Sequence, residues 1–204
     1  GKVFRLKTYE LPEASRTAKG TAIVNLLQLA QGEKVTAVMP VTDFNDDSLY
    51  VLMATSNGLI KKTKLSEYSN IRKTGIQAIT LKEDDELIDV RLTDGNNDII
   101  MVTKEGLSIR FKEEEVRAVG RTSMGVKGIA LGKEDKVVGM EPIKEDNGYV
   151  LAITENGFGK RTELEEYRCQ GRAGKGVLTY KITSKTGNIV GVKLVNDHDE
   201  VMLI

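Results

Sequence analysis

Short apolar runs recur along the chain, and each is bounded by residues that favour turns. The runs lie at 49–53, 99–102, 149–153 and 201–204 and are rich in Val, Ile, Leu and Met. Over 107–112, apolar and polar residues alternate, and a period of two is typical of a strand with one buried face. Runs this short indicate strands rather than helices. Helix is expected only as single turns, near 112–116 and 164–167.

Two glycines mark each of four repeats. The first glycine of each repeat is Gly1, Gly58, Gly106 or Gly157, which gives a period of about 50. Asn57-Gly58 and Asn156-Gly157 lie between two apolar runs, and Asn-Gly is a strong signal for a hairpin turn. The second glycine is Gly20, Gly75, Gly125 or Gly176. A strand is predicted after each second glycine, from Thr21, Ile76, Val126 and Val177, and a last strand near Val35, Leu87, Val137 and Ile189.

This repeat predicts an all-β fold of propeller type, with about four blades of four strands each. The units are approximately 1–41, 49–92, 98–143 and 149–195, with a final strand at 200–204. Units of this length fit blade arrays better than helical solenoids. No low-complexity linker interrupts residues 1–204, so one domain is expected. Because the chain starts and ends within a unit, we expect it to be a piece of a longer polypeptide.

Composition excludes several kinds of site. The chain has one cysteine, Cys169, and one histidine, His198, which exclude an internal disulfide framework and a cysteine-based zinc site. Neither a metal site nor a cofactor is expected. No apolar run approaches the ~20 residues that span a bilayer, and a cytoplasmic, nucleoid-associated location is expected.

Charge is strongly segregated, although 30 basic and 30 acidic residues cancel over the whole chain. The four windows from first to second glycine, 1–20, 58–75, 106–125 and 157–176, contain 19 basic and 9 acidic residues. The rest of the chain contains 11 basic and 21 acidic residues. Such asymmetry is typical of electrostatic recognition, and a curved belt of positive charge suits bent duplex DNA.

Basic residues also recur at equivalent positions. Arg5, Lys62, Arg110 and Arg161 lie four residues after the first glycine, and Lys7, Lys64 and Lys112 lie two residues further on, with Glu163 as the exception. Positions two apart share one face of a strand, so each unit is expected to present basic groups to solvent. Solubility alone explains any single one of these residues. The DNA-binding candidates are Arg5, Lys7, Arg16, Lys19, Lys61, Lys62, Lys64, Arg72, Lys73, Arg110, Lys112, Arg121, Lys160, Arg161, Arg172 and Lys175.

Several longer runs resemble the C-terminal domain of the A subunit of DNA gyrase. They include Tyr9–Arg16, Ile23–Leu27, Leu59–Thr63, Val116–Gly120 and Asn156–Thr162, in the same order as in that family. The resemblance implies a β-pinwheel, a disc of blades whose outer strands pair between neighbours. It also implies a non-catalytic domain that wraps duplex DNA around a basic perimeter and so supports ATP-dependent negative supercoiling. The implied partners are duplex DNA and, in a heterotetramer, the remaining part of the gyrase A chain together with the gyrase B chain.

The family has a signature, the gyrase-A box Gln-Arg-Arg-Gly-Gly-Lys-Gly, in its first blade. The nearest match here is Gln170, Gly171, Arg172, Ala173, Gly174, Lys175 and Gly176, in which Gly171 and Ala173 depart from the pattern. This match lies in the last unit, so we interpret it as the equivalent loop of a later blade. An ordinary glycine-rich connection between strands is the other interpretation.

Other functions fit less well. Gly174-Lys175-Gly176 lacks the Ser or Thr of a phosphate-binding P-loop, and no Gly-x-Ser-x-Gly nucleophile motif occurs. Two alternatives remain open. One is the corresponding domain of topoisomerase IV, and the other is a propeller-like scaffold that binds an acidic protein partner through the same residues.

Overall fold

The computed structural model describes residues 1–202, and it is all-β apart from single 3-10 turns. The predicted all-β class is therefore confirmed. Unit 1 holds β1 (Lys2–Val3), η1 (Thr8–Glu10) and η2 (Ile23–Asn25). Unit 2 holds β2 (Tyr50–Thr55), β3 (Leu59–Lys64), η3 (Leu65–Tyr68), β4 (Ile76–Gln77) and β5 (Leu87–Thr93). Unit 3 holds β6 (Asp98–Thr103), β7 (Leu107–Lys112), η4 (Glu113–Glu115), β8 (Val126–Lys127) and β9 (Val137–Ile143). Unit 4 holds β10 (Tyr149–Thr154), β11 (Gly159–Glu163), η5 (Leu164–Glu166), β12 (Val177–Leu178) and β13 (Ile189–Val195).

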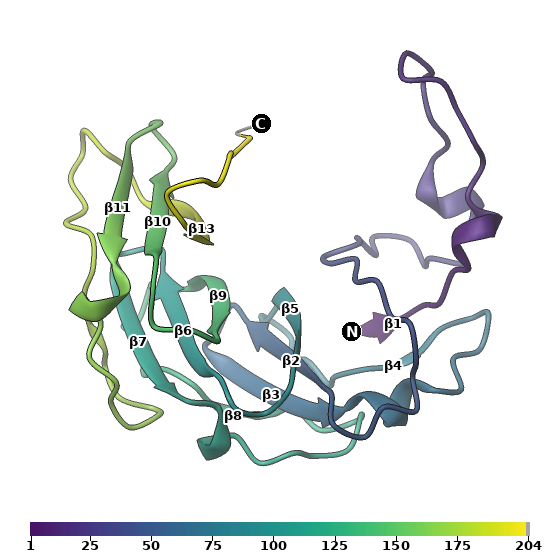
Figure 1. Cartoon of the computed structure of the whole chain (residues 1–204), viewed down its shortest axis with the longest axis horizontal. Coiled ribbons are helices and arrows are strands. Elements are labelled where there is room, and N and C mark those ends of the chain that lie inside the picture. The colour runs from purple at the N-terminus through teal and green to yellow at the C-terminus, as the bar shows by residue number, and fades with distance from the viewer. Residues whose placement is uncertain (203–204) are drawn as a thin grey trace.

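Units 2, 3 and 4 each form an antiparallel sheet with the same order of strands. The central strand (β2, β6 or β10) pairs with the strand after the first glycine, which we call the hairpin strand (β3, β7 or β11). On its other side it pairs with the last strand of the unit, the inner strand (β5, β9 or β13). The units follow an arc in which the inner strands lie on the concave side and the hairpin strands on the convex side (Figure 1).

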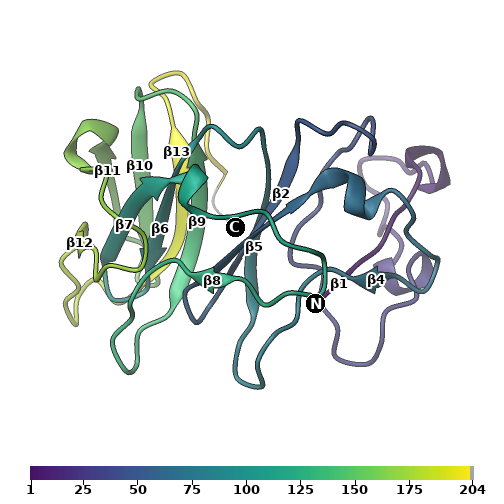
Figure 2. The same cartoon turned by 90° about the horizontal axis from the view of Figure 1, so that it is seen from below.

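Units 2, 3 and 4 each contribute one short strand that pairs with a strand of the preceding unit. The two-residue strand after each second glycine, here called the linking strand (β4, β8 or β12), pairs with a hairpin strand of the preceding unit. Thus β4 pairs with β1, β8 with β3 and β12 with β7. The linking strands β12, β8 and β4 follow one another along the convex side (Figure 2).

The hydrophobic core lies between neighbouring sheets rather than within any one unit. One cluster packs Leu52 and Ile60 of unit 2 against Ile99, Ile109 and Phe111 of unit 3, all fully buried. A second cluster joins units 3 and 4 in the same way, and a third packs unit 2 against segments of unit 1. Each sheet therefore depends on its neighbour for much of its apolar burial.

The repeated glycines lie where one unit contacts the next. In the first three units, the carbonyl of the first glycine accepts two backbone N–H groups from the following unit: Ala78 and Ile79 bond Gly1, Gly128 and Ile129 bond Gly58, and Thr179 and Tyr180 bond Gly106. Gly106 has φ +90, and a Cβ there would lie 2.0 Å from the carbonyl oxygen of Tyr180. The second glycine of unit 4 is equally confined, since a Cβ at Gly176 would lie 2.3 Å from the carbonyl oxygen of Ser108. Only glycine fits both the positive φ and the close approach.

Unit 1 lacks two of its predicted strands. It contributes only β1, and the segments expected to form strands from Thr21 and near Val35 are irregular apart from η2. In units 2 to 4 the central strand bonds both the hairpin strand and the inner strand. Among residues 4–41, which follow β1, no segment joins a β-ladder.

The final strand expected at 200–204 is also wrong for Glu200–Met202, which are irregular and exposed. Leu203 and Ile204 lie outside the described residues. The predicted single helical turns near 112–116 and 164–167 are confirmed as η4 and η5.

Replacement of Gly106 by alanine tests the contact between units. Gly106→Ala should lower the free energy of unfolding by about 3 kcal/mol or more, because the added Cβ meets the backbone of unit 4. Gly157→Ala is the matched control, since Gly157 has φ +79 but no atom within 4 Å of an added Cβ. It should cost about 1 kcal/mol from the positive φ alone. Urea unfolding followed by circular dichroism measures both, and equal losses would contradict this account.

Candidate nucleic-acid interface

Most of the basic candidates are exposed, and many lie on the convex side of the arc. Among the candidates, the exposed ones are Arg5, Lys7, Arg16, Lys19, Lys64, Arg72, Lys73, Lys112, Lys160, Arg161 and Lys175, and the half-buried ones are Arg121 and Arg172. Many belong to the loops before the linking strands, which face the viewer in Figure 2. The remaining three, Lys61, Lys62 and Arg110, are buried.

Lys62 joins unit 2 to unit 3. Its Nζ donates to the carbonyl of Glu113 at 3.1 Å and lies 3.8 Å from the Glu113 carboxylate. Glu113 is itself fully buried, and its carboxylate also accepts hydrogen bonds from Thr93 Oγ1 at 2.7 Å and Asn97 Nδ2 at 2.8 Å. A buried ion pair with its remaining oxygens satisfied is costly to break from one side only.

Arg110 makes the equivalent connection from unit 3 to unit 4. One terminal nitrogen, NH1, donates to the carbonyl of Leu164 at 3.1 Å, and Nε donates to Asp98 at 2.8 Å. Burial alone would raise the pKa of Asp98, but hydrogen bonds from Lys112 and Arg110 outweigh it and lower that pKa. The Arg110 guanidinium is thus held between its own sheet and the 3-10 turn of the next unit.

The expectation that every unit presents the residue four after the first glycine to solvent is therefore wrong for units 2 and 3. Lys62 is 6% exposed and Arg110 is 8% exposed. The 3-10 turn of the following unit covers this part of the hairpin strand, whereas Lys64 and Lys112, two residues later, are exposed. In unit 4, Arg161 is exposed; it forms an ion pair with Asp197 at 3.0 Å and stacks over Tyr149.

Lys61 is buried for a different reason. Its Nζ donates to the carbonyls of Ala78 and Arg121, each at 2.5 Å, beneath the loop that precedes β8. Lys160, at the same position of unit 4, donates to the carbonyl of Thr179 at 3.0 Å. Ala78 and Thr179 are equivalent, each three residues after a second glycine. These two lysines connect β3 and β11 to the segment that follows the second glycine of the same unit.

The half-buried arginines connect the loops of successive units. NH1 of Arg121 donates to the carbonyl of Gln77 at 2.8 Å, and NH1 of Arg172 donates to the carbonyl of Lys127. Both arginines lie four residues before the second glycine of their own unit. Both acceptor residues lie two residues after the second glycine of the preceding unit. Sequence reasoning identified these arginines as surface charge but missed this second role.

The box-like loop at 170–176 packs along the neighbouring unit. Gln170 N donates to the Arg110 carbonyl at 2.8 Å, Ala173 N donates to the Gly128 carbonyl at 2.8 Å, and the Gly174 carbonyl accepts from Ala130 N at 2.8 Å. Arg172 and Lys175 are the charged side chains of this loop. Ala173 has φ 69, and among the described residues no other non-glycine has a positive φ.

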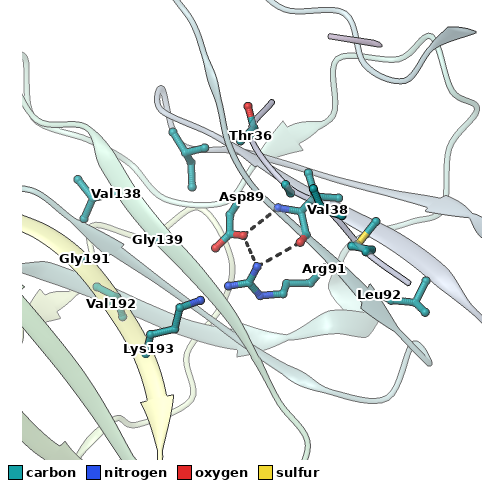
Figure 3. Close-up of a pocket in the computed structure, with 14 residues that line it drawn as sticks. Thr36, Val38, Asp89, Arg91, Leu92, Val138, Gly139, Gly191, Val192 and Lys193 are labelled. Atoms are coloured by element: carbon teal, nitrogen blue, oxygen red, sulfur yellow. Dashed lines mark hydrogen bonds and ion pairs between the residues drawn. The ribbon is translucent and has the colours of Figure 1, made fainter. Parts of the chain in front are cut away.

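The concave side carries a different charge pattern. A pocket there is lined by β5, β9, β13 and residues 36–39 (Figure 3). Arg91, Glu141 and Lys193 occupy the same position of the three inner strands, and Glu141 bonds Arg91 at 2.9 Å and Lys193 at 3.2 Å. Asp89 pairs with Arg91 as well. These charges compensate one another, so the concave side does not suit a polyanion.

Among residues 1–202, no three His, Cys, Asp or Glu side chains gather as possible metal ligands. Within the same range, no helix has the length and apolar content to cross a bilayer.

The positive φ of Ala173 leads to a prediction about the free energy of unfolding. Ala173→Gly should raise the free energy of unfolding by roughly 0.5–1 kcal/mol, because relief of the left-handed backbone outweighs the added chain entropy of glycine. Ala130→Gly, next to the same loop but without a positive φ, should lower it. Urea unfolding of both variants measures the difference, and destabilisation by Ala173→Gly would contradict the assignment.

The lowered pKa of Lys61 leads to a prediction about how the stability of the fold changes with pH. Burial, followed by the charge of Arg121, lowers its pKa to about 8, and Glu67 opposes this shift. Between about pH 8 and the ordinary lysine pKa near 10.5, the unfolded chain binds more protons, so stability gained from this group rises with pH. The difference in unfolding free energy between wild type and Lys61→Met should therefore change in favour of wild type by roughly 2 kcal/mol over that range. A difference that stays constant with pH would contradict it.

Comparison with known proteins places this arrangement in a family. The model of the family "DNA gyrase C-terminal domain, beta-propeller" matches residues 1–42, 49–94, 97–144 and 148–196. The DNA gyrase A chain of Clostridium acetobutylicum is 53% identical over 204 residues, and that of Escherichia coli K12 is 47% identical over 204 residues. The chain is covered completely and spans 24% and 23% of these relatives, respectively.

Two solved structures share the fold. The C-terminal domain of DNA topoisomerase IV superposes with a TM-score of 0.88 and 32% identity, covering 97% of this chain and 61% of that one. The DNA gyrase A C-terminal domain superposes with a TM-score of 0.82 and 26% identity, covering 97% of this chain and 63% of that one. With its four matched repeats and its strand exchange between units, the chain belongs to the family of DNA gyrase C-terminal domains.

Proposed function

We propose that this chain is a non-catalytic module that binds and bends duplex DNA along its convex side, with little sequence preference. The observation that carries the proposal is the row of exposed basic residues in the segments before the second glycines of units 1, 2 and 4, which the half-buried Arg121 continues in unit 3. They include Lys19, Lys73 and Lys175, each within two residues of a second glycine. Contacts of this kind go to phosphates and carry no sequence information.

The curvature of the arc suits this role. Bending a short duplex by 40–90° costs about 1–6 kcal/mol, and contacts spread over several units can offset that cost. Each neutralised phosphate also releases counterions, which favours binding at low salt. The compensated charges of the concave side leave the convex side as the surface for DNA.

In the whole protein, this module would support ATP-dependent negative supercoiling in the bacterial cytoplasm, together with the remaining part of the gyrase A chain and with the gyrase B chain. Curated relatives at 45–53% identity are gyrase A chains by name, which favours gyrase. The corresponding domain of topoisomerase IV remains the alternative, because its structure has the higher TM-score of the two above.

Duplex affinity measured across a salt series tests the proposal. At least four contacted phosphates, one per unit, should give a log–log slope of about −3.6 or steeper in fluorescence anisotropy. The triple variant Lys19→Gln, Lys73→Gln, Lys175→Gln should lose about 2.7 of that slope, since each lysine removes about 0.9.

The matched control is Lys34→Gln, Lys82→Gln, Lys133→Gln, which removes the same charge from exposed lysines outside the basic windows. It should keep the slope of the wild type. Equal losses in the two triple variants would argue for a diffuse charge effect. Absence of duplex binding by the wild type at low salt would overturn the proposal and favour a protein-binding scaffold.

A further inference from the structure

A groove crosses the boundary between units 2 and 3. Its lining comes from β4, the loop before it and the loop before β8, which lie on the convex side (Figure 2). The polar side chains that line it are Asn70, Arg72, Thr74, Gln77, Arg121 and Thr122. Arg72 belongs to unit 2 and Arg121 to unit 3, so a ligand that contacts both would bridge the two units.

The groove is positively charged and its arginines are not neutralised. Among the ion pairs of residues 1–202, none includes Arg72 or Arg121. The buried ammonium of Lys61 lies directly beneath, bonded to the carbonyl of Arg121 at 2.5 Å. Glu67 is the acidic group that acts on Lys61, and it makes no hydrogen bond to the loop before β8 within the described part of the chain.

Arg121 is held in place for such a ligand. Its NH1 donates to the carbonyl of Gln77 at 2.8 Å, and this is the hydrogen bond that its side chain makes among the described residues. The planar guanidinium is therefore oriented while its other N–H groups stay available. An arginine fork matches the geometry of a phosphate, and Thr74 and Thr122 add hydroxyl donors to the same lining.

The boundary between units 3 and 4 provides an internal comparison. Arg172 and the carbonyl of Lys127 repeat the contact of Arg121 with Gln77. However, the position of Arg72, three residues before the second glycine, is Thr122 in unit 3. In addition, the carboxylate of Glu115 bonds the backbone N–H of Arg172 at 2.9 Å, which places a negative charge on that loop. The two boundaries are therefore built alike but differ in charge.

We propose that the groove between units 2 and 3 binds one phosphodiester group of duplex DNA, with Arg72 and Arg121 as its two cationic partners from different units. This inference rests on the proposed function and adds a defined phosphate site to it. Because the ligand bridges two units, its binding stabilises the boundary between them. The boundary between units 3 and 4 lacks the second arginine and binds phosphate more weakly.

Titration with dimethyl phosphate, followed by amide NMR, tests the site without DNA. Resonances of Gly75 and Thr122 should shift with increasing dimethyl phosphate, whereas those of Ala173 and Gly174, at the next boundary, should shift several-fold less. Arg72→Gln should abolish the shifts. Arg117→Gln, an exposed arginine outside the groove in unit 3, should leave them unchanged. Equal shifts at both boundaries, or shifts that persist in Arg72→Gln, would overturn the proposal.

Duplex affinity then separates this inference from the proposed function. Because Arg72 and Arg121 share one phosphate, Arg72→Gln and Arg121→Lys should be non-additive. The double variant should bind a 30-base-pair duplex no more than about twofold more weakly than the worse single variant. Arg117→Gln combined with Arg72→Gln should be additive. Additive losses for Arg72 and Arg121 would overturn the shared site but leave DNA binding intact, whereas no duplex binding by the wild type would overturn the proposed function itself.

Arg121→Lys keeps the positive charge, so it also allows loss of the phosphate site to be distinguished from loss of folding. If its urea midpoint matches the wild type, the change in duplex affinity reports the site rather than the boundary between units. Full duplex affinity and unchanged amide shifts in Arg121→Lys would contradict the role given to the arginine fork.

Discussion

The contact on which the rest of the structure depends is the one between the first glycine of a unit and the linking segment of the next. One carbonyl accepts two backbone N–H groups, at Gly1, Gly58 and Gly106 alike. The absence of a side chain lets the two backbones approach, and at Gly106 a single added carbon would overlap the Tyr180 carbonyl. Because the apolar clusters also lie between sheets, no unit is complete without a neighbour. The sheets therefore form an arc whose geometry is set at each boundary.

Those boundaries also explain why basic residues repeat. One set holds units together: Lys62 and Arg110 donate to carbonyls of the next 3-10 turn, and the Lys62 ammonium is matched by the buried Glu113. A buried cation of this kind requires hydrogen-bond partners for its N–H groups. The carbonyls of Glu113 and Leu164 supply them as second hydrogen bonds, since each also accepts a backbone N–H within its own 3-10 turn. Another set is exposed in the loops before the linking strands. Both sets recur with the same period, so a count of charge along the sequence combines two different roles.

The sequence predicted the strands of units 2, 3 and 4 well, because hydrophobic alternation and the paired glycines are local signals. It failed for the strands of unit 1, where the segments after Gly20 carry the same local signals as in other units but join no β-ladder in the described part of the chain. It also failed for the exposure of Lys62 and Arg110. Alternation along a strand tells which side chains share a face, but what covers that face is decided by a 3-10 turn about 50 residues away. Such information is absent from any single repeat.

The half-buried arginines unite the two roles. Arg121 and Arg172 each contribute one N–H to the preceding unit, and this fixes the remaining N–H groups on the convex side. A polyanion that follows the arc contacts residues that already connect neighbouring units, so its binding energy acts on the same boundaries that set the curvature. Units that differ in one residue, such as Arg72 against Thr122, would then respond differently to the same duplex. Under the proposed function, stiffness along the arc and affinity for the duplex would depend on the same set of side chains.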